Sequence, residues 1–113
     1  MSAGPRLTHR LTLEAPVQVS DGAGGVVETW TALGVVWAEV RPRAGRDDAL
    51  GRAPTARMGY KITVRGAPPG HPERPWPGQR FRDGARLFRI YAVSERDPDG
   101  RYLSVQADEE VVQ

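Results

Sequence analysis

Arginine dominates the residues of this chain that could do chemistry. Fifteen of the sixteen basic residues are arginines, Lys61 is the exception, and 14 carboxylates leave a net charge of +2. A guanidinium carries a planar fork of donors that fits phosphate or carboxylate in a bidentate geometry. Selection for such contacts explains the bias. The G/C-rich codons of a high-GC genome explain it as well, and the two explanations are compatible.

The segment from residue 41 to residue 57 concentrates this charge. It holds five arginines against two aspartates, so it carries +3. The arginines are Arg41, Arg43, Arg46, Arg52 and Arg57, and the aspartates are Asp47 and Asp48. Glycines and a proline restrict any helix here to a short turn at 46–50. Connections of this length are uncommon in a compact domain and are usually functional or disordered.

Groups suited to catalysis or metal binding do not form a recognisable set. His9 and His71 are far apart, and the sequence lacks a P-loop, a G-x-S-x-G motif and an H-E-x-x-H motif. Neighbouring acids, as in 108–110, point to opposite faces of a strand. The segment 97–100, Asp-Pro-Asp-Gly, lacks the further ligands of a calcium loop and is typical of a turn. We therefore expect no enzyme, no metal and no cofactor, and we expect His9 to be a half-buried strand residue.

The elements that must position the arginines are strands. Apolar and polar residues alternate in several short runs, separated by Gly-, Asp- and Pro-rich turns. The expected strands are 7–13, 26–30, 35–40, 60–65, 80–82, 86–93 and 101–107. Asp83-Gly84 predicts a tight hairpin, and Pro42 should end the third run. The sequence predicts a mainly β, single-domain barrel or sandwich of six or seven short strands, with a long loop and at most one short helix.

Length and hydropathy bound the architecture further. With 113 residues, a mean hydropathy of −0.51 and no cysteine, the chain should form one domain with a lean core and no disulfide. It shows no signal-peptide pattern and no apolar run long enough for a bilayer. We expect Trp30 and Trp37 in the core. Trp76 lies in the proline-rich segment 66–79, and we expect it either to plug one barrel end or to anchor an interface.

Several short motifs follow one another along nearly the whole chain. They are Leu7-x-His9-Arg10-Leu11-x-Leu13, Asp21-Gly22-x-Gly24, Trp30, Val36-Trp37-Ala38-x-Val40-x-Pro42, Gly45-Arg46, Ile62-Thr63-Val64-Arg65, Arg86-Leu87-Phe88-Arg89-Ile90 and Arg101-Tyr102-Leu103. In this order and spacing they resemble the head–tail joining family, also called head-closure or stopper proteins, of tailed phages and gene transfer agents. The proline-rich segment 66–79 departs from the family pattern and leaves the role of that surface open.

The resemblance implies one head-closure-like β-barrel domain over residues 1–113. Such a subunit would form a homo-oligomeric ring, six- or twelve-fold, at the head–tail junction of a particle made in the bacterial cytoplasm. A portal or adaptor ring would lie above it and a tail terminator or tail tube below, with packaged double-stranded DNA in the channel and no membrane partner. Arg41, Arg43, Arg46, Arg52 and Arg57 would then face DNA, and Trp76 with Arg74 would contact a neighbouring ring. A stand-alone nucleic-acid-binding barrel is the alternative, and an enzyme or its accessory subunit is a weaker one.

Overall fold

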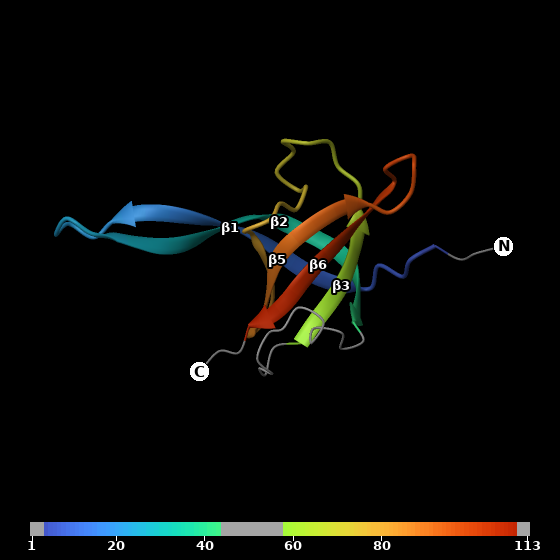
Figure 1. Cartoon of the computed structure of the whole chain (residues 1–113), viewed down its shortest axis with the longest axis horizontal. Coiled ribbons are helices and arrows are strands. Elements are labelled where there is room, and N and C mark those ends of the chain that lie inside the picture. Colours follow the sequence, from blue (N-terminus) through green and yellow to red (C-terminus); the bar gives the residue numbers. More distant parts are fainter. Residues whose placement is uncertain (1–3, 44–57, 111–113) are drawn as a thin grey trace, which may run out of the picture.

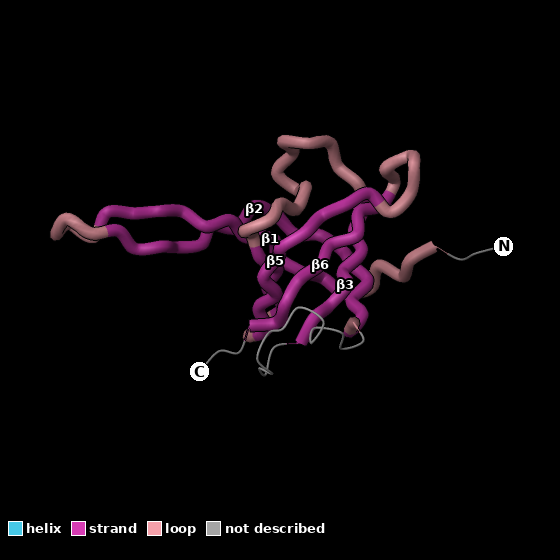
Figure 2. The backbone as a smooth tube through the Cα atoms, in the orientation of Figure 1, coloured by secondary structure: helices cyan, strands magenta, loops and turns pink. Residues whose placement is uncertain are grey.

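Six strands form a closed antiparallel barrel in the computed structural model, which describes residues 4–43 and 58–110 (Figure 1). They are β1 (His9–Ser20), β2 (Val26–Pro42), β3 (Met58–Arg65), β4 (Arg80–Asp83), β5 (Arg86–Glu95) and β6 (Tyr102–Glu110). The order around the barrel is β1-β2-β3-β6-β5-β4, and β4 closes the ring of hydrogen bonds by pairing with β1. The described residues contain strands, turns and loops but no helix (Figure 2), and so none that could cross a membrane. The predicted mainly β barrel is confirmed.

The core follows from alternation along each strand. One residue in two points inward, and these inward positions carry aliphatic and aromatic side chains. The buried set is Leu11, Leu13, Val36, Ala38, Tyr60, Ile62, Val64, Phe81, Phe88, Ile90, Leu103, Val105 and Ala107. Tyr60 and Phe88 meet edge to face, with 5.1 Å between their ring centroids. These side chains form the hydrophobic core inside the barrel.

A two-stranded arm projects from the barrel. Residues 15–20 of β1 pair with residues 26–31 of β2, and their register runs from Ala15 opposite Thr31 to Ser20 opposite Val26. The register shifts between Leu13 and Glu14, where the ribbon leaves the barrel. Figure 1 shows this arm extending far to one side, and the molecule measures 59 × 35 × 24 Å.

The predicted turns are present. At the arm tip, Asp21 Oδ1 accepts the backbone N–H groups of Ala23 and Gly25 at 2.8 and 3.0 Å. β4 and β5 are joined by a two-residue turn in which Gly84 has a φ of 59°, which suits a tight hairpin. In the 97–100 turn, Gly100 N donates to the carbonyl of Asp97.

Some expectations are wrong. The predicted strands 26–30 and 35–40 form one strand, β2, which does end at Pro42 as expected. Trp37 is 52% exposed because Val36 and Ala38 take the inward positions beside it. Trp30 is only half-buried and lies outside the core cluster. His9 is exposed at the start of β1. The short helix predicted at 46–50 lies outside the described residues.

Candidate functional site

Strand order places the described residues that flank 44–57 and the loop 66–79 at opposite ends of the barrel. The end of β2, the start of β3 and the β4–β5 turn share one end, because these strands are antiparallel neighbours around the barrel. The loop 66–79 and the turn 96–101 share the other end, from which the arm also leaves (Figure 1). We call these the arginine end and the proline end. A single subunit thus presents two distinct faces along the barrel axis.

At the arginine end, the structure describes two of the five predicted arginines. Arg41 has a side chain 70% exposed and lies 3.4 Å from a carboxylate oxygen of Glu39. Glu39 also accepts the backbone N–H of Arg6 at 3.0 Å, and these contacts hold the pKa of its carboxyl below the ordinary value. Arg46, Arg52 and Arg57 lie outside the described residues. The channel role of all five arginines therefore stays a prediction.

Arg43 is tied to the barrel wall. Its guanidinium lies over the ring of Tyr91 and donates to the hydroxyl of that residue and to Gln106 Oε1, the latter at 3.1 Å. Gly59 lies beneath the side chain, and a β-carbon placed there would be 3.6 Å from Arg43 Cζ. Arg43 thus crosses β3 to reach β5 and β6. This contact could not be predicted from local sequence, because the partners are 48 and 63 residues away.

A second arginine closes the same end. Arg86 donates from Nε and Nη2 to the two carboxylate oxygens of Glu109, at 2.8 and 3.1 Å, and Nη2 also lies 3.1 Å from the Tyr60 hydroxyl. Its Cζ lies 4.9 Å from the centroid of the Phe88 ring. The hydrogen bond from Arg86 holds the pKa of the Glu109 carboxyl below its usual value, and the bond to Glu109 raises the pKa of Arg86. This bidentate pair caps the aromatic core residues.

At the proline end, Trp76 is 55% exposed, whereas the preceding Pro75 is fully buried. Gln79 Oε1 accepts the backbone N–H of Trp76 at 2.9 Å, and Arg74 donates to the carbonyl of Ala67 at 2.8 Å. Reverse-turn hydrogen bonds follow one another along this loop, for example from Arg74 N to the carbonyl of His71. With 55% of Trp76 exposed, the indole does not plug a barrel end, and Pro75 is the buried residue of the pair. The interface reading for Trp76 and Arg74 stays a prediction.

The projecting arm was not predicted. Its two faces carry different side chains, because successive residues of a strand point to opposite sides. One face has no charged residue; it consists of Ala15, Val17, Val19, Val27, Thr29 and Thr31. An isolated two-stranded ribbon is only marginally stable in water. The alternation of residues 15–19 and the absence of basic residues between 11 and 40 are the signals that could have identified it.

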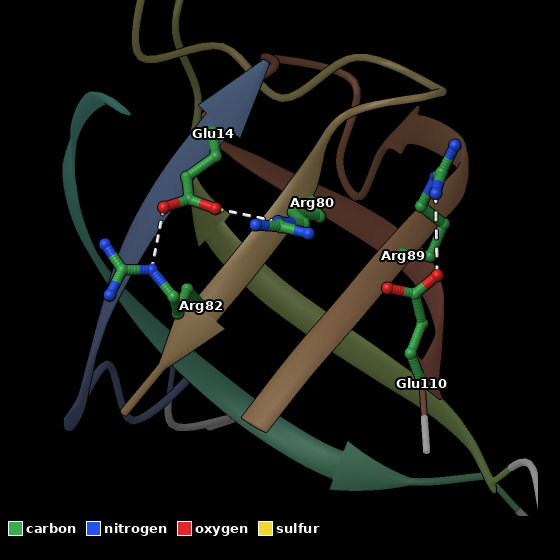
Figure 3. A network of polar contacts seen from close by, with 5 residues as sticks. All are labelled: Glu14, Arg80, Arg82, Arg89 and Glu110. Atoms are coloured by element: carbon green, nitrogen blue, oxygen red, sulfur yellow. Dashed lines mark hydrogen bonds and ion pairs between the residues drawn. The ribbon is translucent and has the colours of Figure 1, made fainter. Parts of the chain in front are cut away.

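The base of the arm is fixed by a buried carboxylate. Glu14 is 5% exposed, and its two oxygens accept from Arg80 Nε and Arg82 Nε, each at 2.7 Å (Figure 3). Burial raises the pKa of the Glu14 carboxyl, but the hydrogen bonds and charges of the two arginines outweigh it, so the pKa is lowered. Trp30, on the arm's other strand, lies against Arg80 and Arg89, with 4.0 and 5.1 Å between each Cζ and the ring centroid.

Arg89 extends this network to the last strand. Its Nη1 lies 3.5 Å from a carboxylate oxygen of Glu110 (Figure 3). Charged groups of β1, β4, β5 and β6 therefore surround the point at which the arm emerges. These charged groups pair with one another, which suits a structural role at the base of the arm better than a ligand-binding role.

Histidine and acidic side chains are the remaining candidates for a metal site. In the part of the chain that the structure describes, no three of them are grouped so that they could hold a metal ion. His71 is exposed, and its Nδ1 accepts the backbone N–H of Glu73 at 3.1 Å. The arrangement offers surfaces for assembly: two barrel ends and an arm.

Comparisons with known proteins identify the family. The family described as phage head completion protein matches residues 1–110. A chain of the virion of a native gene transfer agent particle is similar in structure, with a TM-score of 0.79 and 50% identity over 97% of this chain and 100% of that one. A Shigella flexneri 2a protein solved in solution shares the fold, with a TM-score of 0.67 and 21% identity over 96% of both chains. No curated protein gives a significant match. The chain therefore belongs to the phage head completion protein family and is a structural protein at the head end of a virion.

Proposed function

We propose that this chain is a head-closure, or stopper, subunit and that residues 1–113 act as one domain. Copies form a ring of six or twelve below a portal or adaptor ring. The ring retains the packaged double-stranded DNA and receives the tail terminator or tail tube on its other face. The family match over residues 1–110, with 50% identity to a chain of a gene transfer agent virion, carries this proposal.

The division of the barrel into two ends supports a connector role. A subunit between two different rings needs two different faces, and here one end carries Arg41 and Arg43 while the other carries Trp76 and Arg74. The exposed indole at the proline end suits an interface, because tryptophan and arginine are enriched among the residues that contribute most to binding. In this proposal the Trp76 loop contacts the adjacent ring.

The arginine end supports contact with DNA. Arg43 and Met58, the described residues on either side of 44–57, lie at this end, and the segment 41–57 carries +3 in sequence. Contacts from arginine to phosphate are independent of base sequence and weaken with salt, which is what a channel that passes any genome requires. In this proposal Arg41, Arg43, Arg46, Arg52 and Arg57 line or close the channel.

The rival function, a free nucleic-acid-binding barrel, gains little from the structure. Such proteins stack bases on aromatic side chains along a basic groove. Here Trp37 lies on β2, Tyr91 on β5 and Trp76 in the proline-end loop. Tyr91 is also engaged by Arg43, so these exposed rings do not form one platform.

Imaging of particles from the source strain tests the proposal. The subunit is located by a tag, and particles from a deletion strain are compared with the parent. We expect a ring of density between portal and tail in the parent, and tailless heads that have lost their DNA in the deletion strain. Complete, DNA-filled particles after deletion would show that the chain is not the closure protein. Absence of the chain from particles would favour the free DNA-binding alternative.

A further inference from the structure

A groove on the outside of the barrel has exposed apolar walls. It has a volume of about 360 Å³ and lies between the outer face of β2 and the start of the 66–79 loop. Its apolar lining includes Leu7, Val35, Trp37 and Pro68. The Trp37 side chain is held there by its neighbours in β2, since Val36 and Ala38 point into the core. Trp37 is 52% exposed on this face, and exposed apolar surface of this kind marks an interaction site, so we treat the groove as a docking surface.

Charge on the rim of the groove is mainly positive. Arg65 lines it, and Arg10 is the register partner of Trp37 on β1, on the same outward face. Glu73 is the carboxylate among the lining residues, and His71 completes the rim. Arg65 and Glu73 balance each other in the lining, and the adjacent Arg10 gives the surroundings an excess of one positive charge. The groove is thus suited to an apolar segment that carries negative charge.

The arm of the same molecule has these properties. Residues 15–31 include Asp21 and Glu28 and no basic residue, so the arm carries −2 while the whole chain carries +2. The uncharged face of the arm exposes Val17, Val19 and Val27, at 40%, 42% and 51%. The uncharged face of the arm and the Trp37 groove therefore have opposite charges around them.

These two surfaces cannot meet within one chain. β2 runs continuously from the arm into the barrel, and Val27 precedes Val35 by eight residues of extended strand. That separation corresponds to about 26 Å at the usual rise of a strand. Figure 1 shows the arm directed away from the barrel. The arm can reach such a groove only on another molecule.

We propose that the arm of one copy docks its Val17–Val19–Val27 face into the Trp37 groove of the next copy. The two surfaces are different patches of one chain, so the contact is head-to-tail and generates a ring when the rotation closes. Cavities of this size hold a few side chains rather than a whole ribbon, so valine side chains enter the groove and the ribbon lies across its mouth. This inference deepens the proposed ring and rests on the proposed function only for the expectation that the ring closes.

Mixing two variants of the full-length chain tests the contact. Val27→Asp places a charge on the docking face of the arm, and Trp37→Asp places one in the groove. Both sites are exposed, and both substitutions add the same negative charge, so the two variants cannot compensate each other. Sedimentation of the wild type up to millimolar concentration should show assemblies larger than dimers, whereas each variant alone should stay monomeric. An equal mixture retains one intact arm and one intact groove, and should give a species of twice the monomer mass and nothing larger.

Pro98→Asp is the matched control, because it adds the same charge to an exposed turn and should assemble like the wild type. A wild type that remains monomeric or stops at dimers, or a mixture that stays monomeric, would overturn the proposed contact. Circular dichroism confirms that each variant is folded. The result is separable from the proposed function: DNA-filled particles without the protein would refute head closure and leave the arm–groove contact standing.

Discussion

The guanidinium of Arg80 lies over the indole of Trp30, with 4.0 Å between Cζ and the ring centroid. The same guanidinium donates to the buried Glu14, so one side chain touches both strands of the arm where they leave the barrel. Cation–π contacts gain strength when the cation is shielded from water, and the Arg80 side chain is only 17% exposed. The arm is therefore held at its base by Arg80.

Replacing Arg80 by methionine should loosen this joint. The substitution keeps the aliphatic stem but removes the charge, leaving Glu14 with one arginine partner and Trp30 with Arg89 alone. We expect the free energy of unfolding to fall by about 2 kcal/mol. We also expect faster hydrogen exchange at the amides of 15–31. Arg82→Met is the control, because Arg82 binds Glu14 but is not among the cations placed over Trp30. Equal loss of arm protection in both variants would mean that the Trp30 contact does not hold the arm.

Acid should weaken the Arg86–Glu109 pair. The pKa of Glu109 is lowered in the folded protein from its ordinary value of 4.5, so the folded state binds fewer protons than the unfolded state in mild acid. The stabilisation is complete above the unfolded pKa and is lost as the pH falls through the folded pKa. Because the Arg86 side chain is 46% exposed, we expect Glu109→Gln to cost about 1 kcal/mol at neutral pH.

Urea unfolding at neutral pH and in strong acid measures this difference. The gap between wild type and Glu109→Gln should close in acid, where the wild-type carboxyl is also uncharged. Glu110→Gln is the matched control, since Glu110 meets Arg89 at 3.5 Å, which is long for a charge-assisted bond, and should cost less. A difference in free energy of unfolding between wild type and Glu109→Gln that stays constant with pH would contradict a stabilising ion pair between Arg86 and Glu109.

The barrel strands were predictable because a half-buried strand alternates. Leu11 and Leu13, or Tyr60, Ile62 and Val64, mark the inward face without any knowledge of the partner strands. The Asp83-Gly84 hairpin was predictable from the turn chemistry alone. These signals are local, and the structure follows them.

Features that depend on distant partners could not be predicted. Trp37 was expected in the core because it is large and apolar, but register gives the inward positions to the smaller Val36 and Ala38. The break expected between the predicted strands 26–30 and 35–40 is absent because β1 pairs with β2 from Val26 to Ala38, apart from one register shift. Arg43 meets Tyr91 only after β5 and β6 are in place. In each case, the pairing of strands distant in sequence determines the burial or contact, and the local pattern does not.

Gly66 should not tolerate a side chain. A β-carbon there would overlap the carbonyl oxygen of Gly100, and Gly66 N donates to the carbonyl of Arg101 at 2.8 Å. Backbone atoms on both sides cannot move aside cheaply, so we expect Gly66→Ala to cost about 3 kcal/mol. Thermal unfolding measures the loss. Gly59→Ala is the matched control, because its β-carbon would make ordinary contacts at 3.6–3.7 Å, and a similar loss there would show that the cost is not steric.

Trp76→Ala should reduce the assembly of complete particles without destabilising the subunit. The indole is 55% exposed and the neighbouring Pro75 provides the buried contact, so removal of the ring should change the free energy of unfolding by less than about 0.5 kcal/mol. The yield of tailed particles, counted by electron microscopy, is the functional measurement. An unchanged yield would argue against the proposed role of this loop at a ring interface. Val93→Ala, at a partly buried position packed on the core, should show the opposite pattern of lower stability and normal assembly once folded.

Neutralising the five arginines of 41–57 tests the DNA channel. Substitution of glutamine for Arg41, Arg43, Arg46, Arg52 and Arg57 turns a segment of +3 into one of −2 and keeps side chains of similar polarity. DNA leakage from tailless heads should be greater for the variant than for the wild type. Leakage should increase more steeply with salt in the wild type than in the variant, because only the wild type has these phosphate contacts to lose. Arg43→Gln alone is the control for losing contacts within the barrel, since that arginine also binds Tyr91 and Gln106. Unchanged retention in the five-fold variant would remove these arginines from the closure mechanism.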